Sequence, residues 1–270
     1  MDVLSDVIAV ARTGRPHATL TERQGPWEVR HEPFAGAGFH LVLEGGCRFT
    51  SLDGRSLELR AGDVVFLPRG SAHTVSGGAT VMMCGAYLMD REWKHPLLDE
   101  LPEFIHLSGH HESRGAIELL TAELRGPREG GDALLAALLD AMLVYLLRAW
   151  LDDDREHSGW STALRDTAIR TALQAIHDAP EHPWTVADLG RAAGLSRPVF
   201  ARRFTALVGR PPLAYLTWWR MTTAARHLRE SDLPLRAVAV RVGYSSEYAF
   251  SAAFKRELGQ APGSYRRAAG

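Results

Sequence analysis

The stretch that decides the fold lies near the end of the 270-residue chain, from Leu235 to Arg267, and reads LRAVAVRVGYSSEYAFSAAFKRELGQAPGSYRR. Its first part places apolar residues at the i, i+3 and i+7 positions of one helix face, namely Leu235, Val238 and Val242. Gly243 follows, and glycine ends a helix easily because it adopts the left-handed conformation. A second helix is predicted beyond it, with Phe250 and Phe254 on one side. Two short helices joined by a tight turn predict a helix-turn-helix motif.

The same pattern occurs about 50 residues earlier, in Thr185–Phe204, with a glycine turn at Gly194 and two aromatic residues four positions apart. Between the two copies, Pro212–Arg229 is predicted to be one helix, whose roughly 17 residues span about 26 Å. Successive major-groove faces of a duplex lie about 34 Å apart. The two motifs are therefore expected to enter adjacent major grooves from one side of the DNA.

These residues resemble the AraC/XylS family of bacterial transcription regulators, through LGRAAGLSRPVFARRF in the first copy and GYSSEYAFSAAFKRELGQAPGSYRR in the second. The resemblance covers residues 164–268 and implies a seven-helix DNA-binding domain with helix-turn-helix motifs at 185–206 and 234–257. It also implies a regulator of transcription, which we expect to be an activator. Double-stranded DNA is the expected partner, and RNA polymerase is a further partner that such a regulator could have.

The charge distribution agrees with a DNA-binding C-terminal part. Residues 165–270 hold 16 Lys and Arg against 8 Asp and Glu, a net charge of +8, whereas the rest of the chain holds 15 against 24, a net charge of −9. Such a difference between halves predicts that the C-terminal part meets a polyanion. Chance variation in charge is the alternative explanation.

The second helix of the first motif offers three arginines, Arg197, Arg202 and Arg203. Arginine matches guanine bidentately and also binds phosphate. The family resemblance places Pro198, Ala201 and Arg202 at positions that face the bases, and Arg202 is the strongest candidate for a base contact. Arg203 has an equally good alternative as a solvated or phosphate-side arginine.

The second motif offers few base-reading donors. Its outward positions are Ser246, Glu247, Tyr248, Ser251 and Ala252. Lys255 and Arg256 follow at the end of the helix, where phosphate contacts are expected. The second motif is therefore expected to contribute backbone affinity and shape readout. The serines at 196 and 246 are better explained as helix caps than as base readers.

The N-terminal part predicts a different architecture, so the fold class is α+β with two domains. After an N-terminal segment that is helical over residues 1–20, short apolar runs divided by glycine turns predict an antiparallel barrel or sandwich over residues 25–90. The predicted strands are Trp27–Pro33, Gly38–Glu44, Cys47–Leu52, Ser56–Leu59, Asp63–Leu67, Ala72–Val75 and Thr80–Tyr87. Helices follow over residues 113–151, and together these elements form the expected sensor and dimerisation domain, residues 1–151.

A long apolar helix over Asp132–Leu151 is expected to be covered on several sides. A homodimer contact is one explanation, and burial within the monomer is a close alternative. The charged segment of residues 152–163 is interpreted as a linker to the DNA-binding domain, residues 164–268. No apolar run reaches the roughly 20 residues that span a membrane, and no signal peptide is present. A cytoplasmic protein with free thiols is expected.

The predicted strands resemble a cupin, on the residues GFHLVLEG from Gly38 and GDVVFLPRGSAH from Gly62. Metal-binding cupins supply two histidines, a glutamate and a later histidine. His40, Glu44 and His73 match three of these, and Gly38 stands at the position of the first histidine. The resemblance implies that this set could hold Zn²⁺ or Fe²⁺. Alternatively, His40 is a core or pocket histidine and Glu44 a turn residue, and the three residues line an effector pocket without metal.

The only cysteines, Cys47 and Cys84, form neither a disulfide framework nor a zinc motif. In cupin-domain relatives of this family, cysteines sometimes respond to oxidants, so the pair is a redox candidate. Buried cysteines that act as small hydrophobic residues are the alternative.

Three functions remain open from the sequence. The first is a transcription regulator whose cupin domain binds a small effector or dimerises, and which is not an enzyme. The second is a cupin enzyme, a metal-dependent dioxygenase or isomerase, fused to a DNA-binding domain; the missing histidine at Gly38 argues against it. The third is an architectural DNA binder whose barrel serves only for dimerisation.

Overall fold

The computed structural model describes residues 2–89, 95–109, 113–152 and 159–269. These residues form two compact units. The sheet unit holds strands β1 to β7 with helices α3 and α4, and the helical unit holds α1, α2 and α5 to α12. Two helices expected in the N-terminal domain thus group with the helical unit. Most of the predicted linker, residues 153–158, lies outside the described residues.

The sheet unit contains one antiparallel sheet, whose seven strands are β1 (His17–Arg23), β2 (Trp27–His31), β3 (Gly36–Ser51), β4 (Ser56–Arg60), β5 (Val64–Leu67), β6 (His73–Leu88) and β7 (Ile105–Leu107). The strands pair in the order β1-β6-β3-β5-β7, while β2 also pairs with β6 and β4 with β3. Within the described residues this order is open, with no pairing between its two ends. The cupin-like sheet is therefore not the closed barrel that the turn spacing suggested.

Two strands are far longer than predicted, because two glycine-rich segments lie inside strands. The segment Glu44-Gly45-Gly46 does not form a turn; β3 continues through it against β6, with register shifts on either side of Gly45. Gly45 has φ +76°, and a Cβ there would lie 2.3 Å from the carbonyl oxygen of Ala79. A glycine at such a position produces a β-bulge rather than a strand end.

The N-terminal segment also differs from the prediction. Helix α1 (Val3–Ala11) ends well before residue 20, and the chain then enters β1. The apolar spacing of the first eleven residues was correctly interpreted, but the alternating residues from His17 to Arg23 form a strand that pairs with β6. The short strand β7 was likewise not predicted.

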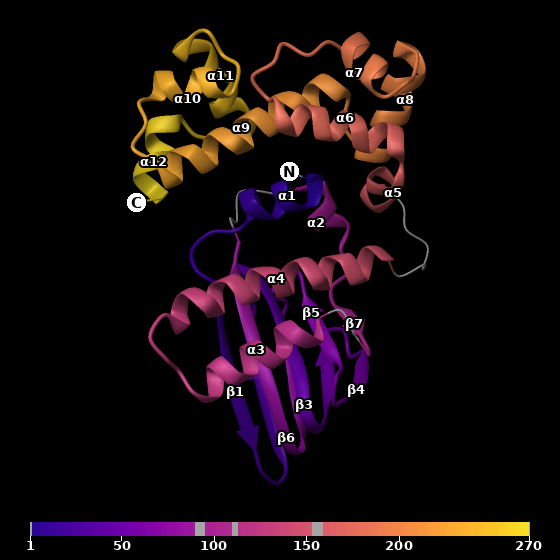
Figure 1. The fold of residues 1–270 in the computed structure, drawn as a ribbon, viewed down its shortest axis with the longest axis vertical. Coiled ribbons are helices and arrows are strands. Elements are labelled where there is room, and N and C mark those ends of the chain that lie inside the picture. The colour runs from indigo at the N-terminus through magenta and orange to yellow at the C-terminus, as the bar shows by residue number, and fades with distance from the viewer. Residues whose placement is uncertain (1, 90–94, 110–112, 153–158, 270) are drawn as a thin grey trace. The chain divides into compact units, whose positions relative to one another are not determined.

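Each face of the sheet has its own partners. Helices α3 (Arg114–Arg125) and α4 (Gly131–Asp152) lie over one face (Figure 1). The Tyr87 hydroxyl donates a hydrogen bond to the Leu139 carbonyl of α4 at 2.7 Å, and Arg12 pairs with Asp140. Side chains of the other face form a separate buried cluster that includes Phe49 and Val75. Since strand residues alternate between faces, neighbouring residues of β3 serve two different environments.

Helix α4 is only partly buried by this packing. By length and composition it is the one described helix that could cross a membrane, but a single such helix is weak evidence, since core helices pass the same test. Its buried residues, Leu139, Met142, Leu143, Leu146 and Leu147, form one stripe. Leu134 remains 42% exposed, and Leu119 of the neighbouring α3 remains 55% exposed.

The helical unit is built around α9 (Pro212–Glu230) (Figure 1). The remaining helices are α2 (Pro96–Glu100), α5 (Trp160–Arg165), α6 (Thr167–Asp178), α7 (Val186–Ala192), α8 (Arg197–Val208), α10 (Leu235–Arg241), α11 (Glu247–Leu258) and α12 (Pro262–Ala269). The helices α6 to α12 match the seven that the family resemblance implied. Helices α7 and α8 form the first predicted motif, and α10 and α11 form the second.

Helix α1 packs on α6 and α9 within this unit. His177 is the polar centre of the contact: its Nδ1 lies 3.2 Å from an Asp6 carboxylate oxygen and its Nε2 lies 2.8 Å from the Tyr215 hydroxyl. The His177 ring also stacks on Trp219 at 3.7 Å between centroids. A buried histidine with both ring nitrogens satisfied avoids the cost of unpaired polar groups.

The turn of the second motif yields a stability prediction. Gly243 has φ +81°, and a Cβ there would lie 2.7 Å from the Glu181 carbonyl oxygen, whereas Gly209 has φ +77° with no atom near its Cβ position. Gly209→Ala should therefore cost about 1–2 kcal/mol from backbone strain alone. Gly243→Ala should lower the free energy of unfolding further, as measured by urea denaturation. Equal losses for the two variants would contradict the packing described for Gly243.

Candidate nucleic-acid interface and sensor site

The first motif is assembled by a cap, a turn and a small core. Thr185 and Asp188 form a capping box at the start of α7, with each side chain bonded to the other residue's backbone N–H. Gly194, at φ +68°, makes the turn into α8. Leu189 of α7 and Phe200 of α8 are fully buried. These contacts fix which face of α8 is turned outward.

The outward face of α8 carries most of the predicted contact residues. The exposed residues are Arg197, Pro198, Val199, Arg202 and Arg203, and Ala201 is half-buried. Arg203 is held by the fold, because its Nη2 lies 2.5 Å from Asp166, which caps α6 through bonds from the Ala168 and Ile169 N–H groups. Among the described residues Arg202 has no hydrogen-bond or ion-pair partner. Arg202 is thus available to a ligand in a way that Arg203 is not.

The second motif repeats this geometry with different surface chemistry. Ser246 caps α11 by accepting from the Ala249 N–H at 3.3 Å, whereas Ser196 makes no such side-chain bond at α8. The exposed residues of α11 are Glu247, Tyr248, Ala249, Ala252, Lys255 and Arg256, and Ser251 is half-buried. Tyr248 is 85% exposed at the first turn, so the main feature of this face is an aromatic side chain. Arg256 lies 3.5 Å from Glu257.

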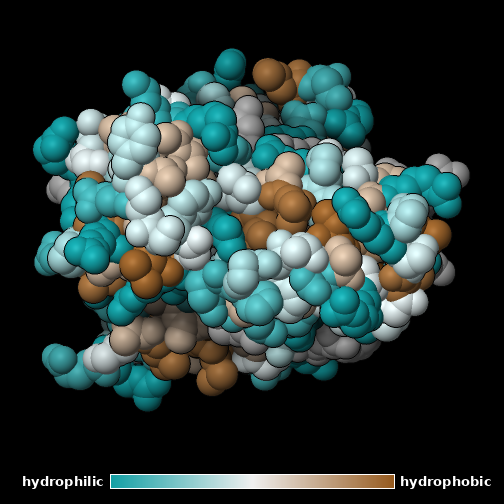
Figure 2. All heavy atoms as spheres, turned by 90° about the horizontal axis from the view of Figure 1, so that it is seen from above, coloured by the Kyte–Doolittle hydropathy of each residue, from teal (hydrophilic) through white to brown (hydrophobic). Residues whose placement is uncertain are grey.

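The surface seen from above Figure 1 is mostly hydrophilic, with small separate hydrophobic patches (Figure 2). On α8 to α11 the large apolar side chains that are exposed are Val199, Leu213, Val240 and Tyr248. Such a surface, with arginines beside a few apolar groups, has the composition of a DNA-binding face rather than of a buried protein interface.

The sheet unit gathers three histidines on the face opposite α3 and α4. His40 of β3 and His73 of β6 are buried, and their Nε2 atoms lie 2.7 Å apart. His31, which ends β2, pairs in register with His73, and the two rings stack at 4.7 Å between centroids. Ligand atoms of the three residues all lie within 4.8 Å of one another.

Glu44 does not join this group. It lies beyond the register shift of β3 and is exposed, with its carboxylate 3.3 Å from Arg125 of α3. The expected set of His40, Glu44 and His73 therefore lacks its carboxylate, and His31 is the residue that the sequence interpretation missed. A signal was present, since Trp27, Val29 and His31 alternate on one side of a predicted strand.

The hydrogen bonds order the protons through this cluster. His73 Nδ1 donates to the Ser71 carbonyl at 2.7 Å, so in a neutral ring its Nε2 carries a lone pair. His40 Nε2 then donates to His73, and its Nδ1 accepts from the Cys84 thiol, whose sulfur lies 3.1 Å away. Each histidine is thus fixed in one tautomer by a neighbour.

Burial keeps these groups uncharged. It lowers the pKa of His73 to about 4 and that of His40 well below the usual value, and the neighbouring histidines add to the second shift. It also raises the pKa of Cys47 to about 11 and that of Cys84 to about 12. Since the thiolate is the reactive form, two such thiols are poorly suited to react with oxidants at neutral pH.

The chemistry of this donor set fits a metal ion of the kind the cupin resemblance implied. Neutral imidazoles bind zinc and related ions through ring nitrogens. The carbonyl of Ser71 orients His73 as outer hydrogen-bond partners of metal ligands do. The set differs from the expected one in having three nitrogen donors and no carboxylate.

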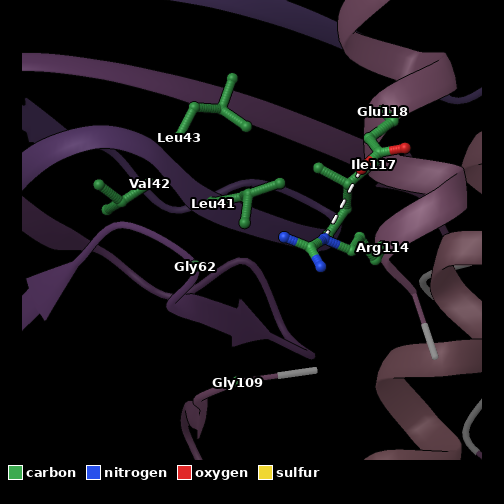
Figure 3. Close-up of a pocket in the computed structure, with 8 residues that line it drawn as sticks. All are labelled: Leu41, Val42, Leu43, Gly62, Gly109, Arg114, Ile117 and Glu118. Carbon is green, nitrogen blue, oxygen red and sulfur yellow. Dashed lines mark ion pairs between the residues drawn. The ribbon is translucent and has the colours of Figure 1, made fainter. Parts of the chain in front are cut away.

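A cavity of about 280 Å³ lies on the other face of the sheet, between β3 and α3 (Figure 3). Its lining is mainly apolar, with Leu41, Leu43 and Ile117 among its walls. Arg114 also lines it and pairs with Glu118 at 3.6 Å. Figure 3 shows the two charged side chains on α3, with Leu41 facing Ile117 across the cavity. This cavity was not predicted from the sequence.

Comparison with known proteins covers both units. Residues 2–152 match the cupin family, and residues 189–268 match a family of helix-turn-helix domains. A putative AraC-like transcription regulator of Streptomyces lividans is 33% identical over 99% of this chain and 98% of its own. The RCS-specific HTH-type transcriptional activator RclR of Escherichia coli is 31% identical over 98% of this chain and 97% of its own. A solved DNA complex of the AdpA DNA-binding domain is 36% identical over 38% of this chain and 92% of that one, with a TM-score of 0.36.

Proposed function

The chain belongs to the AraC-like transcription regulators, and we propose that it reads its operator chiefly through Arg202 of α8. Two observations support this assignment. Arg202 is exposed on the outward face of α8, and no described side chain or backbone group pairs with it. Arginine is also the residue that most often reads guanine in the major groove. Arg197 and Arg203 flank it and supply positive charge toward phosphate, Arg203 from its ion pair with Asp166.

The second motif has a different role in this proposal. Tyr248, Ser251 and Ala252 give α11 an outward face that is poor in charged donors, while Lys255 and Arg256 follow at its end. We infer that α11 sits in the neighbouring major groove, held by phosphate contacts, and adds shape readout and contact with thymine methyl groups. The protein acts where chromosomal DNA is, in the cytoplasm.

The sheet unit is proposed to receive the signal. The cavity between β3 and α3 is closed by apolar residues and carries one arginine. A small, mostly apolar molecule with an anionic group fits this lining, because the apolar walls favour hydrocarbon and the guanidinium favours an anion. An effector there would contact both the sheet and α3, on which α4 packs.

We propose further that α4 forms a homodimer contact, since a partner would cover the exposed apolar side chains on α3 and α4. Leu134→Glu should then shift the protein from dimer to monomer in sedimentation velocity at micromolar concentration. Leu52→Glu is the matched control, because Leu52 is 73% exposed in a turn of the same unit, away from these helices. A wild-type chain that sediments as a monomer would end the proposal, as would a Leu134→Glu dimer as tight as the wild type.

The reading role of Arg202 predicts a loss that depends on DNA sequence. Arg202→Ala should weaken binding to the operator by about 1–3 kcal/mol and relax the preference at one base pair. Lys255→Ala is the control: it should weaken all sequences alike and reduce the salt slope of log K by about 1. Fluorescence anisotropy with operator and random duplexes measures both, the operator being found by sequencing DNA fragments that the protein retains. If Arg202→Ala lost equal affinity for both duplexes, Arg202 would not read a base.

A further inference from the structure

We propose that His31, His40 and His73 form a divalent metal site of the zinc class, with three neutral imidazoles and an open fourth position. The site lies on the sheet face opposite the apolar cavity, and the inference does not depend on the proposed DNA-reading role. It differs from the cupin ligand set because His31 of β2 replaces the carboxylate of Glu44.

The distances suit an ion after a small adjustment. Two nitrogens at 2.0–2.1 Å from a tetrahedral zinc lie about 3.3 Å apart. The Nε2 atoms of His40 and His73 lie 2.7 Å apart, and the third ligand atom lies within 4.8 Å. An ion would therefore separate the first pair slightly and draw His31 inward. His31 is only half-buried at the end of its strand, so its ring can rotate without repacking the core.

The surrounding groups are arranged as they are around bound metals. Ser71 directs the His73 Nε2 lone pair toward His40. A metal on His40 Nε2 requires the ring proton to move to Nδ1, where the Cys84 sulfur lies 3.1 Å away and can accept it. Cys84 is thus an outer partner of His40 rather than a ligand. Outer partners of this kind commonly change metal affinity by about 10- to 100-fold.

The ligand set also selects the ion. Three imidazoles suit Zn²⁺, Co²⁺, Ni²⁺ or Cu²⁺, whereas Mg²⁺ and Ca²⁺ require oxygen ligands. Non-haem iron oxygenases use two histidines and one carboxylate, and Glu44 is paired with Arg125 instead. The geometry therefore favours a regulatory or structural ion over dioxygenase iron. An ion held here would tie β2 to β3 and β6.

The test titrates the untagged full-length chain, stripped with EDTA, with Zn²⁺ in competition with a chromophoric chelator. We expect one Zn²⁺ per chain, and at least a 10-fold weaker affinity for both His31→Ala and His40→Gln. Glu44→Gln is the matched control and should bind as the wild type does. Circular dichroism of each variant establishes that a loss of binding is not a loss of fold.

Titration with Co²⁺ identifies the ligands independently. A tetrahedral or five-coordinate nitrogen site gives visible absorption bands, and no sulfur-to-cobalt charge-transfer band should accompany them. Three results would overturn the proposal: no stoichiometric Zn²⁺ in the stripped wild type, a loss on Glu44→Gln as large as on His31→Ala, or a thiolate charge-transfer band that disappears in Cys84→Ser. None of these measurements involves DNA, so failure of the metal site and failure of the DNA-reading role are separate outcomes.

Discussion

The two reading helices are useful together only if their relative position is fixed, and Arg220 in the middle of α9 supplies the joint. Its Nε donates to the Pro180 carbonyl at 2.6 Å and its Nη2 to the His182 carbonyl at 2.9 Å. Both acceptors lie in the loop that leads into the first motif. The same guanidinium lies 5.8 Å from the centre of the Tyr244 ring, in the turn of the second motif. One side chain thus contacts both motifs, and a lysine could not make this set of directed bonds.

The sheet unit separates two chemical environments by the alternation of one strand. In β3, His40 points to the histidine cluster, whereas its neighbour Leu41 lines the apolar cavity under α3. The bulge at Gly45 ends this regular alternation and turns Glu44 toward Arg125. The same backbone irregularity therefore removes the carboxylate from the metal-ligand set and leaves three nitrogens.

Much of the helical unit could be predicted from the sequence, because its signals are local. Helix spacing, the glycines at turns and the paired aromatics such as Phe250 and Phe254 identify both motifs without tertiary information. The sheet was harder. Gly45 looks like a turn residue, and only its pairing with β6 makes it a bulge. His31 enters the cluster through cross-strand register with His73, and Arg203 is bound by Asp166 from a distant helix end. Such contacts depend on tertiary pairing, which single-sequence patterns do not specify.

The central claim is that α9 and Arg220 hold α8 and α11 as one rigid reader; the 19 residues of α9 span about 28 Å. The most direct measurement is the affinity of the full-length chain for its operator with 5 base pairs, about half a helical turn, inserted between the two half-sites. A rigid reader predicts at least a 10-fold loss for the wild type, and a smaller loss for Arg220→Met, which keeps the side-chain length but lacks the donors. Equal affinity of the wild type for the normal and the extended operator would contradict the account.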